Sequence, residues 1–406
     1  MEKLRDKLKE YNQEHLLRFF DDLIEEEQKQ LLDQINAIDF EEVRALYELA
    51  VNKEVVSASS NIQPLQGETT IKDDWLEIGA NLIKEGKYAV ITMAGGQGSR
   101  LGHEGPKGTY ILEYGINKSI FEIGCDKLKQ IHKDYGVFVY WGIMTSSENH
   151  EATIEFFEKN NYFGYPKEKI SFFQQGLLPM VDQEGKIIMD SKFNIKLGPN
   201  GNGGVIKALF DEGIVQKLES AGVEYIFIGG MDNILMPIGN PILIGFAADN
   251  NYLAITNTVV KEYAEEKVGV FCLKDGKPAM IEYSDMSEEL ANERDEAGNL
   301  VYSDANIIAN IFNIKVIKDI QNDPLPYHVA FKKSDYIDAD GNVIVPDTEN
   351  AYKFETFLFD SFALLDKVGL IRSSRNEVFA PVKNKDGVDS PSTASKLYLD
   401  YYQDKS

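Results

Sequence analysis

The stretch YAVITMAGGQGSRLGHEGPKG, residues 88–108, decides the fold class of this chain. It reads as an apolar strand that enters a glycine-rich loop, with Arg100 and Lys107 close behind. The GGQG run, residues 95–98, allows the backbone to approach a bulky anion and to direct N–H groups at it. An ordinary strand-to-helix turn would need the glycines but not the two cations. The stretch therefore favours a nucleoside triphosphate as ligand.

Two familiar phosphate-binding loops do not match this stretch. A dinucleotide fingerprint requires G-x-G-x-x-G, and Leu101 occupies the third glycine position. A P-loop requires G-x-x-x-x-G-K-[ST], whereas here Pro106 precedes Lys107 and Gly108 follows it. A nicotinamide-dependent dehydrogenase is accordingly disfavoured.

Composition limits the classes of partner. The chain has 406 residues, 43% of them hydrophobic, and a formal net charge of -24. So negative a surface argues against nucleic acid or an anionic membrane as partner, since both attract a basic face. A phosphate site must then be a local cluster of basic residues, and we expect a divalent metal to contribute to phosphate binding there.

Cysteine content and the character of the chain start indicate the compartment. Cys125 and Cys272 have no paired spacing, which fits a reducing cytosol. The start MEKLRDKLKEYNQEHLL is charged, and no stretch approaches the ~20 apolar residues of a membrane helix. We expect a cytoplasmic protein without a membrane span. The oligomeric state has no signature in the sequence.

The hydrophobic pattern predicts an α/β fold in three parts. Residues 1–85 show helical periodicity, including Leu16 to Ile24 and Phe40 to Val51. Residues 86–335 alternate short apolar strands with helices, which predicts a Rossmann-like, mixed but mostly parallel sheet with helices on both faces. Residues 336–406 form a small α+β part, with a hairpin in YIDADGNVIVPD and a final helix after Ser390.

The strands of this sheet can be placed along the chain. The candidates are 88–93, 137–143, 170–173, 224–228, 255–260 and 269–273. Helices are expected over 148–159 and 205–221. Ligands of such sheets bind beyond the carboxyl ends of the strands, where the glycine-rich loop and GGMDN, residues 229–233, both lie.

Asp232 is the best metal candidate. It follows an apolar strand and two glycines, which would expose its carboxylate at the strand end. Mg²⁺ takes oxygen ligands and typically uses one or two carboxylates plus substrate phosphates. The alternative is an Asx turn that closes the strand.

Other candidates carry weaker signals. LGPNGNGGV, residues 197–205, could pack against a base or sugar through Asn202, or could simply cap a helix. Gln175 could read a pyrimidine edge or lie at the surface. Lys353 and Lys383 are lone lysines that pattern alone would leave in solvent.

Hydrolytic machinery is missing from the sequence. The five histidines show no metal-ligand spacing, and neither a G-x-S-x-G elbow nor an H-E-x-x-H helix occurs. A phosphate monoester is already an anion near neutral pH, so it can attack without a general base. Positioning and charge neutralisation would suffice for such a nucleophile.

With these segments in view, the chain resembles the UDP-sugar pyrophosphorylase family, and most closely its UDP-N-acetylglucosamine branch. The shared motifs run in order through most of the chain: QEHLLRF, MAGGQGSRLG, GPKG, IMTSSEN, FFQQGLLPM, GPNGNGG, MDNIL, IEYSD, HVAFKK, FAPVKN and SPSTA. The resemblance implies a Rossmann-like, GT-A-like nucleotidyltransferase domain that transfers uridylyl from UTP to a sugar 1-phosphate with Mg²⁺ and releases pyrophosphate.

The resemblance also implies roles for individual residues. The UTP-binding positions are Met93, Ala94, Gly95, Gly96, Lys107, Gln175, Gly201, Asp232 and Lys353. The sugar-binding positions are Asn202, Gly269, Glu282, Phe359 and Lys383. Arg100, Lys107 and Lys383 correspond to the catalytic cations, and Asp232 to the metal ligand.

One departure from the family concerns the sugar. The N-acetylglucosamine branch reads A-G-N-I-A-N, where this chain has A-N-I-I-A-N over 305–310. The sugar-contacting asparagine position is therefore Ile307, unless Asn306 shifts to replace it. Because a lost polar contact can change specificity greatly, N-acetylglucosamine 1-phosphate competes here with glucose 1-phosphate and galactose 1-phosphate. A non-catalytic uridine-nucleotide sensor is the rival of another class.

Overall fold

The computed structural model describes residues 1–52 and 61–403. Contacts between Cα atoms divide the chain into two compact units. The first comprises Met1–Ser59, Gly176–Gly204 and Leu325–Leu358, and the second Ser60–Gln175, Val205–Pro324 and Phe359–Ser406. The division into domains at 1–85, 86–335 and 336–406 stays a prediction.

The first unit joins the N-terminal helices to short antiparallel sheets. Its helices are α1 (Glu2–Glu10), α2 (Glu25–Ala37) and α3 (Phe40–Val51), with 3₁₀ turns η1 (Glu14–Leu17), η2 (Phe20–Asp22) and η7 (Asn202–Gly204). Its strands are β7 (Leu177–Pro179), β8 (Met189–Ser191), β9 (Asn194–Ile195), β10 (Leu197–Pro199), β16 (Tyr327–Lys332), β17 (Tyr336–Ile337), β18 (Val343–Ile344) and β19 (Ala351–Thr356). Leu31, Ile35 and Phe354 belong to one apolar core, so the N-terminal helices pack on these sheets.

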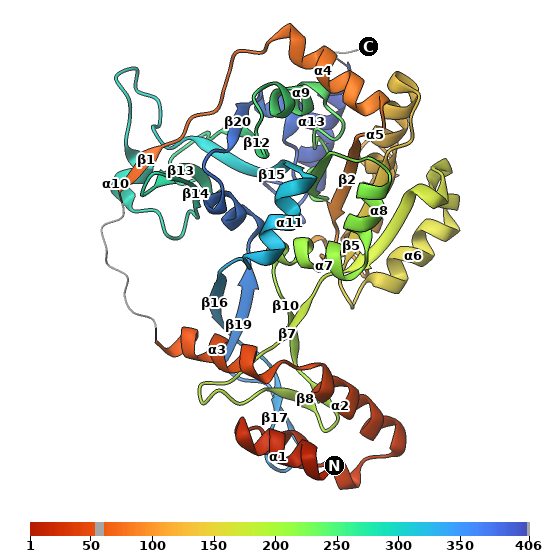
Figure 1. Ribbon diagram of the computed structural model, residues 1–406, viewed down its shortest axis with the longest axis vertical. Helices are drawn as coiled ribbons and strands as arrows, with labels where there is room; N and C mark the ends of the chain where they lie inside the picture. Colours follow the sequence, from red (N-terminus) through yellow and green to blue (C-terminus); the bar gives the residue numbers. More distant parts are fainter. Residues whose placement is uncertain (53–60, 404–406) are drawn as a thin grey trace. The chain divides into compact units, whose positions relative to one another are not determined.

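The second unit contains a ten-stranded sheet within the described residues. Its strands are β1 (Ile62–Pro64), β2 (Tyr88–Met93), β5 (Tyr140–Thr145), β6 (Ile170–Gln174), β11 (Tyr225–Gly230), β12 (Ala254–Val260), β13 (Val270–Lys274), β14 (Lys277–Ile281), β15 (Asp304–Asn313) and β20 (Gly369–Arg372). β11, β2, β5 and β6 are successive parallel neighbours, whereas β15 pairs antiparallel with β11 and β12. The mixed sheet with a parallel core confirms the predicted α/β fold class (Figure 1).

Helices accompany the sheet as the alternating pattern predicted. They are α4 (Asp73–Lys84), α5 (Ile120–Tyr135), α6 (His150–Lys159), α7 (Val205–Asp211), α8 (Ile214–Ser220), α9 (Pro241–Asp249), α10 (Glu288–Asn292), α11 (Ile314–Asn322), α12 (Arg375–Val378) and α13 (Pro391–Gln403). The smaller elements are β3 (Ile111–Leu112), β4 (Lys118–Ser119) and the 3₁₀ turns η3 (Ser99–Leu101), η4 (Lys107–Thr109), η5 (Asn161–Gly164), η6 (Lys167–Lys169) and η8 (Leu358–Leu364). One core collects apolar side chains of α4, α5 and α9 against β2 and β11.

Two local expectations were wrong. The helix expected over 205–221 is two helices, because Gly213 adopts the left-handed conformation (φ 66°) between α7 and α8. Glycine tolerates that conformation at no steric cost, so it ends one helix and starts the next. The periodic segment 16–24 forms the 3₁₀ turns η1 and η2 rather than a helix. The hairpin in 336–347 and the final helix after Ser390 are confirmed.

Among residues 1–52 and 61–403, no helix combines the length and the apolar character that crossing a bilayer requires.

Candidate active site

The glycine-rich loop leaves β2 at the carboxyl end of the parallel strands and folds back on itself. Lys107 N donates to Gly96 O at 3.0 Å, and Gly98 N donates to Gly105 O at 2.9 Å. Gly105 is at φ 112°, a conformation that glycine adopts readily, so the chain can reverse here. This closure returns Lys107 to the start of the loop although eleven positions separate it from Gly96 along the chain.

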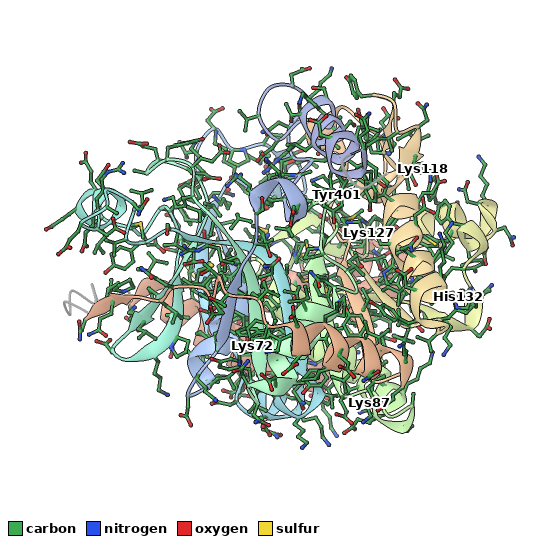
Figure 2. The ribbon with its side chains drawn as sticks, turned by 90° about the horizontal axis from the view of Figure 1, so that it is seen from above. Lys72, Lys87, Lys118, Lys127, His132 and Tyr401 are labelled. Atoms are coloured by element: carbon green, nitrogen blue, oxygen red, sulfur yellow. The ribbon has the colours of Figure 1, made fainter. Side chains whose placement is uncertain are left out.

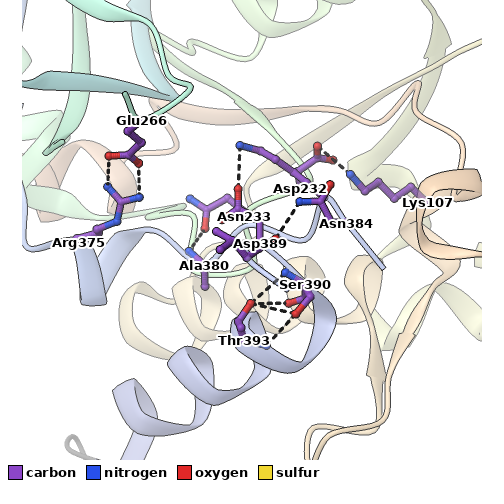
Figure 3. A network of polar contacts seen from close by, with 12 residues as sticks. Lys107, Asp232, Asn233, Glu266, Arg375, Ala380, Asn384, Asp389, Ser390 and Thr393 are labelled. Carbon is purple, nitrogen blue, oxygen red and sulfur yellow. Dashed lines mark hydrogen bonds and ion pairs between the residues drawn. The ribbon is translucent and has the colours of Figure 1, made fainter. Parts of the chain in front are cut away.

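Lys107 forms an ion pair with the candidate metal ligand. Its Nζ lies 2.9 Å from Asp232 Oδ2, and Lys107 is only 8% exposed (Figure 3). The contact follows from the sheet, since Met93 and Gly230 are opposite each other at the ends of β2 and β11. An ammonium so enclosed acts through a weaker dielectric than water. Cation and carboxylate thus meet beside the glycine-rich loop.

Asn149 is a buried residue whose side chain forms hydrogen bonds with the backbone of the glycine-rich loop. It is 0% exposed and follows β5, at the start of α6. Its Nδ2 donates to Ala94 O at 3.0 Å and to Gly96 O at 3.3 Å, and its Oδ1 accepts from Ser146 N at 2.8 Å. Because the carbonyl groups of Ala94 and Gly96 both accept from Asn149, these bonds stabilise the backbone conformation of residues 94–96.

Gln175, the residue that follows β6, lies against the same loop. A Cβ added to Gly95 would lie 2.9 Å from Gln175 Nε2, so the amide end of Gln175 lies directly against Gly95. Gln175 N donates to Thr145 O at 2.8 Å, which anchors the residue at the end of β5. The structure therefore brings Gln175 onto the loop that Met93 and Ala94 open, while Arg100 lies exposed in η3.

Lys383 follows a segment that is attached to the end of β11. Val382 N donates to Asp232 O at 2.8 Å, one residue before Lys383. The ammonium of Lys383 lies 3.5 Å from Asp389 Oδ2 and 5.7 Å from the centre of the Phe379 ring. Asp232 and Lys383 are thus connected through the backbone of Val382.

The predicted sugar residues Gly269 and Glu282 lie at one end of a hairpin. β13 and β14 pair from Val270 opposite Ile281, so these two residues come just beyond the last pair. Asn306 joins them, because its N donates to Gly269 O at 2.9 Å and its Nδ2 lies 3.1 Å from Met280 Sδ. Phe359 is buried at the start of η8.

The structure places the Ile307 side chain in the apolar core. Ile307 is 4% exposed and belongs to the apolar core of the second unit, whereas Asn306 and Ile308 are partly exposed. A bulge in β15 causes this, with Ile308 at φ 55°, an unusual conformation for a β-branched residue. Asn306 Oδ1 accepts from Ile308 N at 2.8 Å and so supports the bulge. Of the two alternatives, Ile307 or a shifted Asn306, the burial of Ile307 and the contact of Asn306 with Gly269 favour Asn306, and the sugar contact stays a prediction.

Three further candidates lie in the first unit. Asn202 Oδ1 accepts from Leu358 N at 2.8 Å. Gly201, at φ 86°, approaches Thr356 so closely that a Cβ would lie 2.2 Å from its carbonyl oxygen. Lys353 on β19 pairs with Glu355 at 2.9 Å. Within the first unit, Gly201 therefore packs against β19, the strand that also carries Lys353.

The donor set near Asp232 fits a magnesium ion only with help from substrate. No group of three or more His, Cys, Asp or Glu side chains that could hold a metal occurs in the described ranges. One carboxylate plus phosphate oxygens and water is, however, an arrangement that Mg²⁺ commonly takes. Asp232 can supply that carboxylate.

Comparison with known proteins defines the class of this chain. The model of the family UTP–glucose-1-phosphate uridylyltransferase matches residues 39–398, so the chain is an enzyme of the uridylyltransferase class. It belongs to the UDPGP family.

Three proteins similar to this chain are named for UDP-N-acetylglucosamine. UDP-N-acetylglucosamine pyrophosphorylase of Saccharomyces cerevisiae is 36% identical over 383 residues, 91% of this chain and 80% of the yeast protein. UDP-N-acetylglucosamine diphosphorylase 2 of Arabidopsis thaliana is 32% identical over 424 residues, 98% of this chain and 83% of the plant protein. The crystal structure of the uridine diphosphate N-acetylglucosamine pyrophosphorylase from Trypanosoma brucei matches with a TM-score of 0.83 and 29% identity, over 97% of this chain and 83% of that one.

Two residues of the site were not singled out from the sequence. Asn149 lies in IMTSSEN and Asn233 in MDNIL, yet a single asparagine near a strand end is usually part of a turn. Their burial and their bonds to distant backbone distinguish them, and both become visible only in the folded chain.

Proposed function

We propose that this chain transfers the uridylyl group of UTP to N-acetylglucosamine 1-phosphate and releases pyrophosphate. Membership of the uridylyltransferase family supports the type of reaction. The yeast, plant and trypanosome relatives are named for UDP-N-acetylglucosamine, which supports the sugar.

The observation that carries the proposal is the Lys107–Asp232 pair beside the glycine-rich loop. An enclosed cation at 2.9 Å from a carboxylate, next to backbone that glycine leaves accessible, suits the phosphates of UTP. Arg100 adds a second positive charge on the exposed side of the same loop. The strongly acidic chain thus has two cations, Lys107 and Arg100, on one loop.

The chemistry needs charge neutralisation more than proton transfer. A phosphate oxygen of the sugar phosphate attacks the α-phosphorus of UTP and forms the new P–O bond. The bond from the α-phosphorus to the oxygen bridging the β-phosphorus breaks, and its electron pair leaves with pyrophosphate. Lys107, Arg100 and Lys383 would stabilise the charge that moves onto the leaving group. No proton has to be removed from the nucleophile.

Magnesium is part of this proposal. When bound, Mg²⁺ supplies neutralisation of phosphate charge, and Asp232 is the residue that would hold it. Asp232 also pairs with Lys107 Nζ, so this carboxylate orients the ammonium at the loop.

The remaining roles stay predictions. On the nucleotide side these are contacts by Met93, Ala94, Gly95, Gly96, Gln175, Gly201 and Lys353. On the sugar side they are contacts by Asn202, Gly269, Glu282, Phe359 and Lys383. Cytoplasmic localisation is likewise a prediction.

A panel of sugar 1-phosphates tests the proposal. The chain is incubated with UTP, Mg²⁺ and N-acetylglucosamine, glucose or galactose 1-phosphate, and released pyrophosphate is measured. We expect the highest kcat/KM with N-acetylglucosamine 1-phosphate. A preference for glucose or galactose 1-phosphate would keep the reaction and replace the sugar, which the altered 305–310 segment makes a specific alternative. UTP binding without pyrophosphate release from any sugar phosphate would reject catalysis in favour of a nucleotide sensor.

A further inference from the structure

Asn233 is a buried asparagine whose side chain bonds backbone from a distant part of the chain. It is 6% exposed and directly follows Asp232. Its Oδ1 accepts from Ala380 N at 2.8 Å, and its Nδ2 donates to Val378 O at 2.6 Å. The same Oδ1 accepts from Leu235 N at 3.1 Å. One amide group therefore fixes its own turn and the segment 378–380 at once.

Backbone bonds on both sides of Asn233 extend this attachment. Ile234 N donates to Ala380 O at 3.1 Å, and Val382 N donates to Asp232 O at 2.8 Å. Together they form a short antiparallel bridge between Asn233 and Pro381. Because the side-chain bonds reach Val378 and Ala380, they set the register of this bridge and not merely its presence.

The register decides where Lys383 stands. Lys383 comes one residue after Val382, whose N–H binds the carbonyl of Asp232. On its other side, the backbone N of Lys383 donates to Asp389 O at 2.6 Å. A shift of the bridge by one residue would move Lys383 by about 3.3 Å along the strand direction. Such a displacement is large compared with the geometric tolerance of catalysis.

We infer that Asn233 is a positioning residue, which holds Lys383 at a fixed distance from Asp232 and Lys107 so that the three charged groups act on one substrate. This inference rests on the proposed function, since it takes Lys383 as a phosphate-binding cation. Figure 3 shows Lys107 paired with Asp232, and Asn233 next to Asp232 with its side chain bonded to Ala380.

A merely structural role makes a different prediction. If Asn233 only stabilised the fold, its loss would lower stability and would act independently of Lys383. If it positions Lys383, removing Lys383 abolishes the kinetic effect of removing Asn233, because residues that act as a unit are not additive.

The test is a kinetic double-mutant cycle of Asn233→Ala and Lys383→Ala in the full chain, with N-acetylglucosamine 1-phosphate, UTP and Mg²⁺. We expect Lys383→Ala to lower kcat about 100-fold, the scale for losing a positioned electrostatic group. We expect Asn233→Ala to lower kcat about 10-fold, as a misplaced group does. The double variant should match Lys383→Ala within about twofold. A double variant about 1000-fold slower than wild type would overturn the inference, because the two losses would then be independent.

Two further variants serve as a control and as a replacement should Asn233→Ala fail to fold. Asn240→Ala is the matched control, because Asn240 Oδ1 accepts from Ile242 N, also two residues ahead, which is a bond within its own turn. Its kcat should stay within about twofold of wild type. If Asn233→Ala does not fold, Asn233→Asp takes its place in the cycle, since a carboxylate can still accept from Ala380 N but cannot donate to Val378 O. Additivity of Asn233→Asp with Lys383→Ala would equally overturn the inference. Wild-type kinetics of Lys383→Ala alone would instead remove Lys383 from the proposed function.

Discussion

Lys107 Nζ lies 2.9 Å from Asp232 Oδ2, although 125 positions separate the two residues in the chain. Both follow strands that are neighbours in the parallel core, so the sheet brings the ends of β2 and β11 side by side. The glycine-rich loop then returns Lys107 to this point by its bond to Gly96. A cation and a carboxylate are thereby placed together beside the glycine-rich loop.

Replacing Lys107 by alanine is expected to lower kcat about 100-fold or more, because the reaction loses an enclosed cation on the leaving pyrophosphate. The measurement is steady-state release of pyrophosphate at saturating UTP. Lys118→Ala is the control, since Lys118 also pairs with an aspartate, Asp126, but lies outside the loop. Lys107→Ala with nearly wild-type kinetics would reject the assignment of Lys107.

Replacing Asn149 by aspartate is expected to raise the KM for UTP about 10-fold, on the scale of a misplaced binding group. A carboxylate can still accept from Ser146 N, but it faces Ala94 O and Gly96 O without a hydrogen to donate. The loop would then lose its inward attachment. The KM for UTP and the thermal midpoint are measured together. Asn160→Asp at the end of the same helix should leave that KM unchanged, and an equal rise in both variants would contradict the role of Asn149.

Replacing Lys127 by methionine is expected to stabilise the protein most at or below pH 7. Lys127 on α5 donates from Nζ to Met236 O at 2.6 Å, and desolvation lowers its pKa from 10.5 to about 7 (Figure 2). Below pH 7 the ammonium is charged in both states, so its full desolvation cost opposes folding. Between pH 7 and 10.5 the unfolded chain binds more protons at this site, so wild-type stability gains as the pH rises.

The measurement for Lys127 is the difference in thermal midpoint between variant and wild type, taken at about pH 6.5 and about pH 9.5, on either side of the lowered pKa. The gain should shrink at the higher pH. Lys133→Met, on the exposed face of the same helix, should show the same difference at both values. A gain from Lys127→Met that grows as the pH rises would contradict the lowered pKa of this ammonium.

Replacing Asn306 by alanine is expected to raise the KM for the sugar 1-phosphate about 10-fold and to leave the KM for UTP unchanged. The variant loses the polar side chain beside Gly269. It also loses the hydrogen bond that Asn306 Oδ1 accepts from Ile308 N. Kinetics with each substrate varied in turn provide the measurement. An unchanged KM for the sugar phosphate would remove Asn306 from the sugar site.

Replacing Ile307 by asparagine, which restores the family residue in sequence, is expected to destabilise the protein by about 3 kcal/mol without improving sugar binding. The buried position would receive an amide with no partner in the apolar core. Chemical denaturation measures the free energy of unfolding. Ile307→Val is the control variant, and it should lower this free energy by only about 1 kcal/mol. A stable variant with a lower KM for the sugar phosphate would show that Ile307 faces the ligand.

Much of the fold was predictable from local pattern. The strands 88–93 and 170–173, and the helix that starts near Ser390, appear where period and turn residues indicated. The two short helices of 205–221 were missed because apolar spacing runs on through Gly213, and only its left-handed conformation separates them. The 3₁₀ turns near Phe20 share the apolar spacing of a helix over a few residues, so periodicity cannot distinguish them.

The candidate site was predictable to a smaller extent. Lys107 and Asp232 were found from charge and glycine content near strand ends, yet nothing in their spacing revealed that they pair. Asn149 and Asn233 were not predicted, because their burial and their hydrogen bonds to distant backbone have no local pattern in the sequence. The choice between Ile307 and Asn306 could not be made from the sequence, since a bulge in β15 sets which residues of 305–310 face outward.

The amino-acid order alone determined the strand that leads into a glycine loop, the alternation of strands and helices, and the excess of acid over base. These depend on side-chain character and near neighbours, which a linear chain already specifies. Only the tertiary structure decided that Lys107 meets Asp232, that Asn233 holds the segment before Lys383, and that Asn306 rather than Ile307 is accessible. Each of those is a contact or an orientation set by sheet register, and register arises when strands distant in the chain pair and exclude water together.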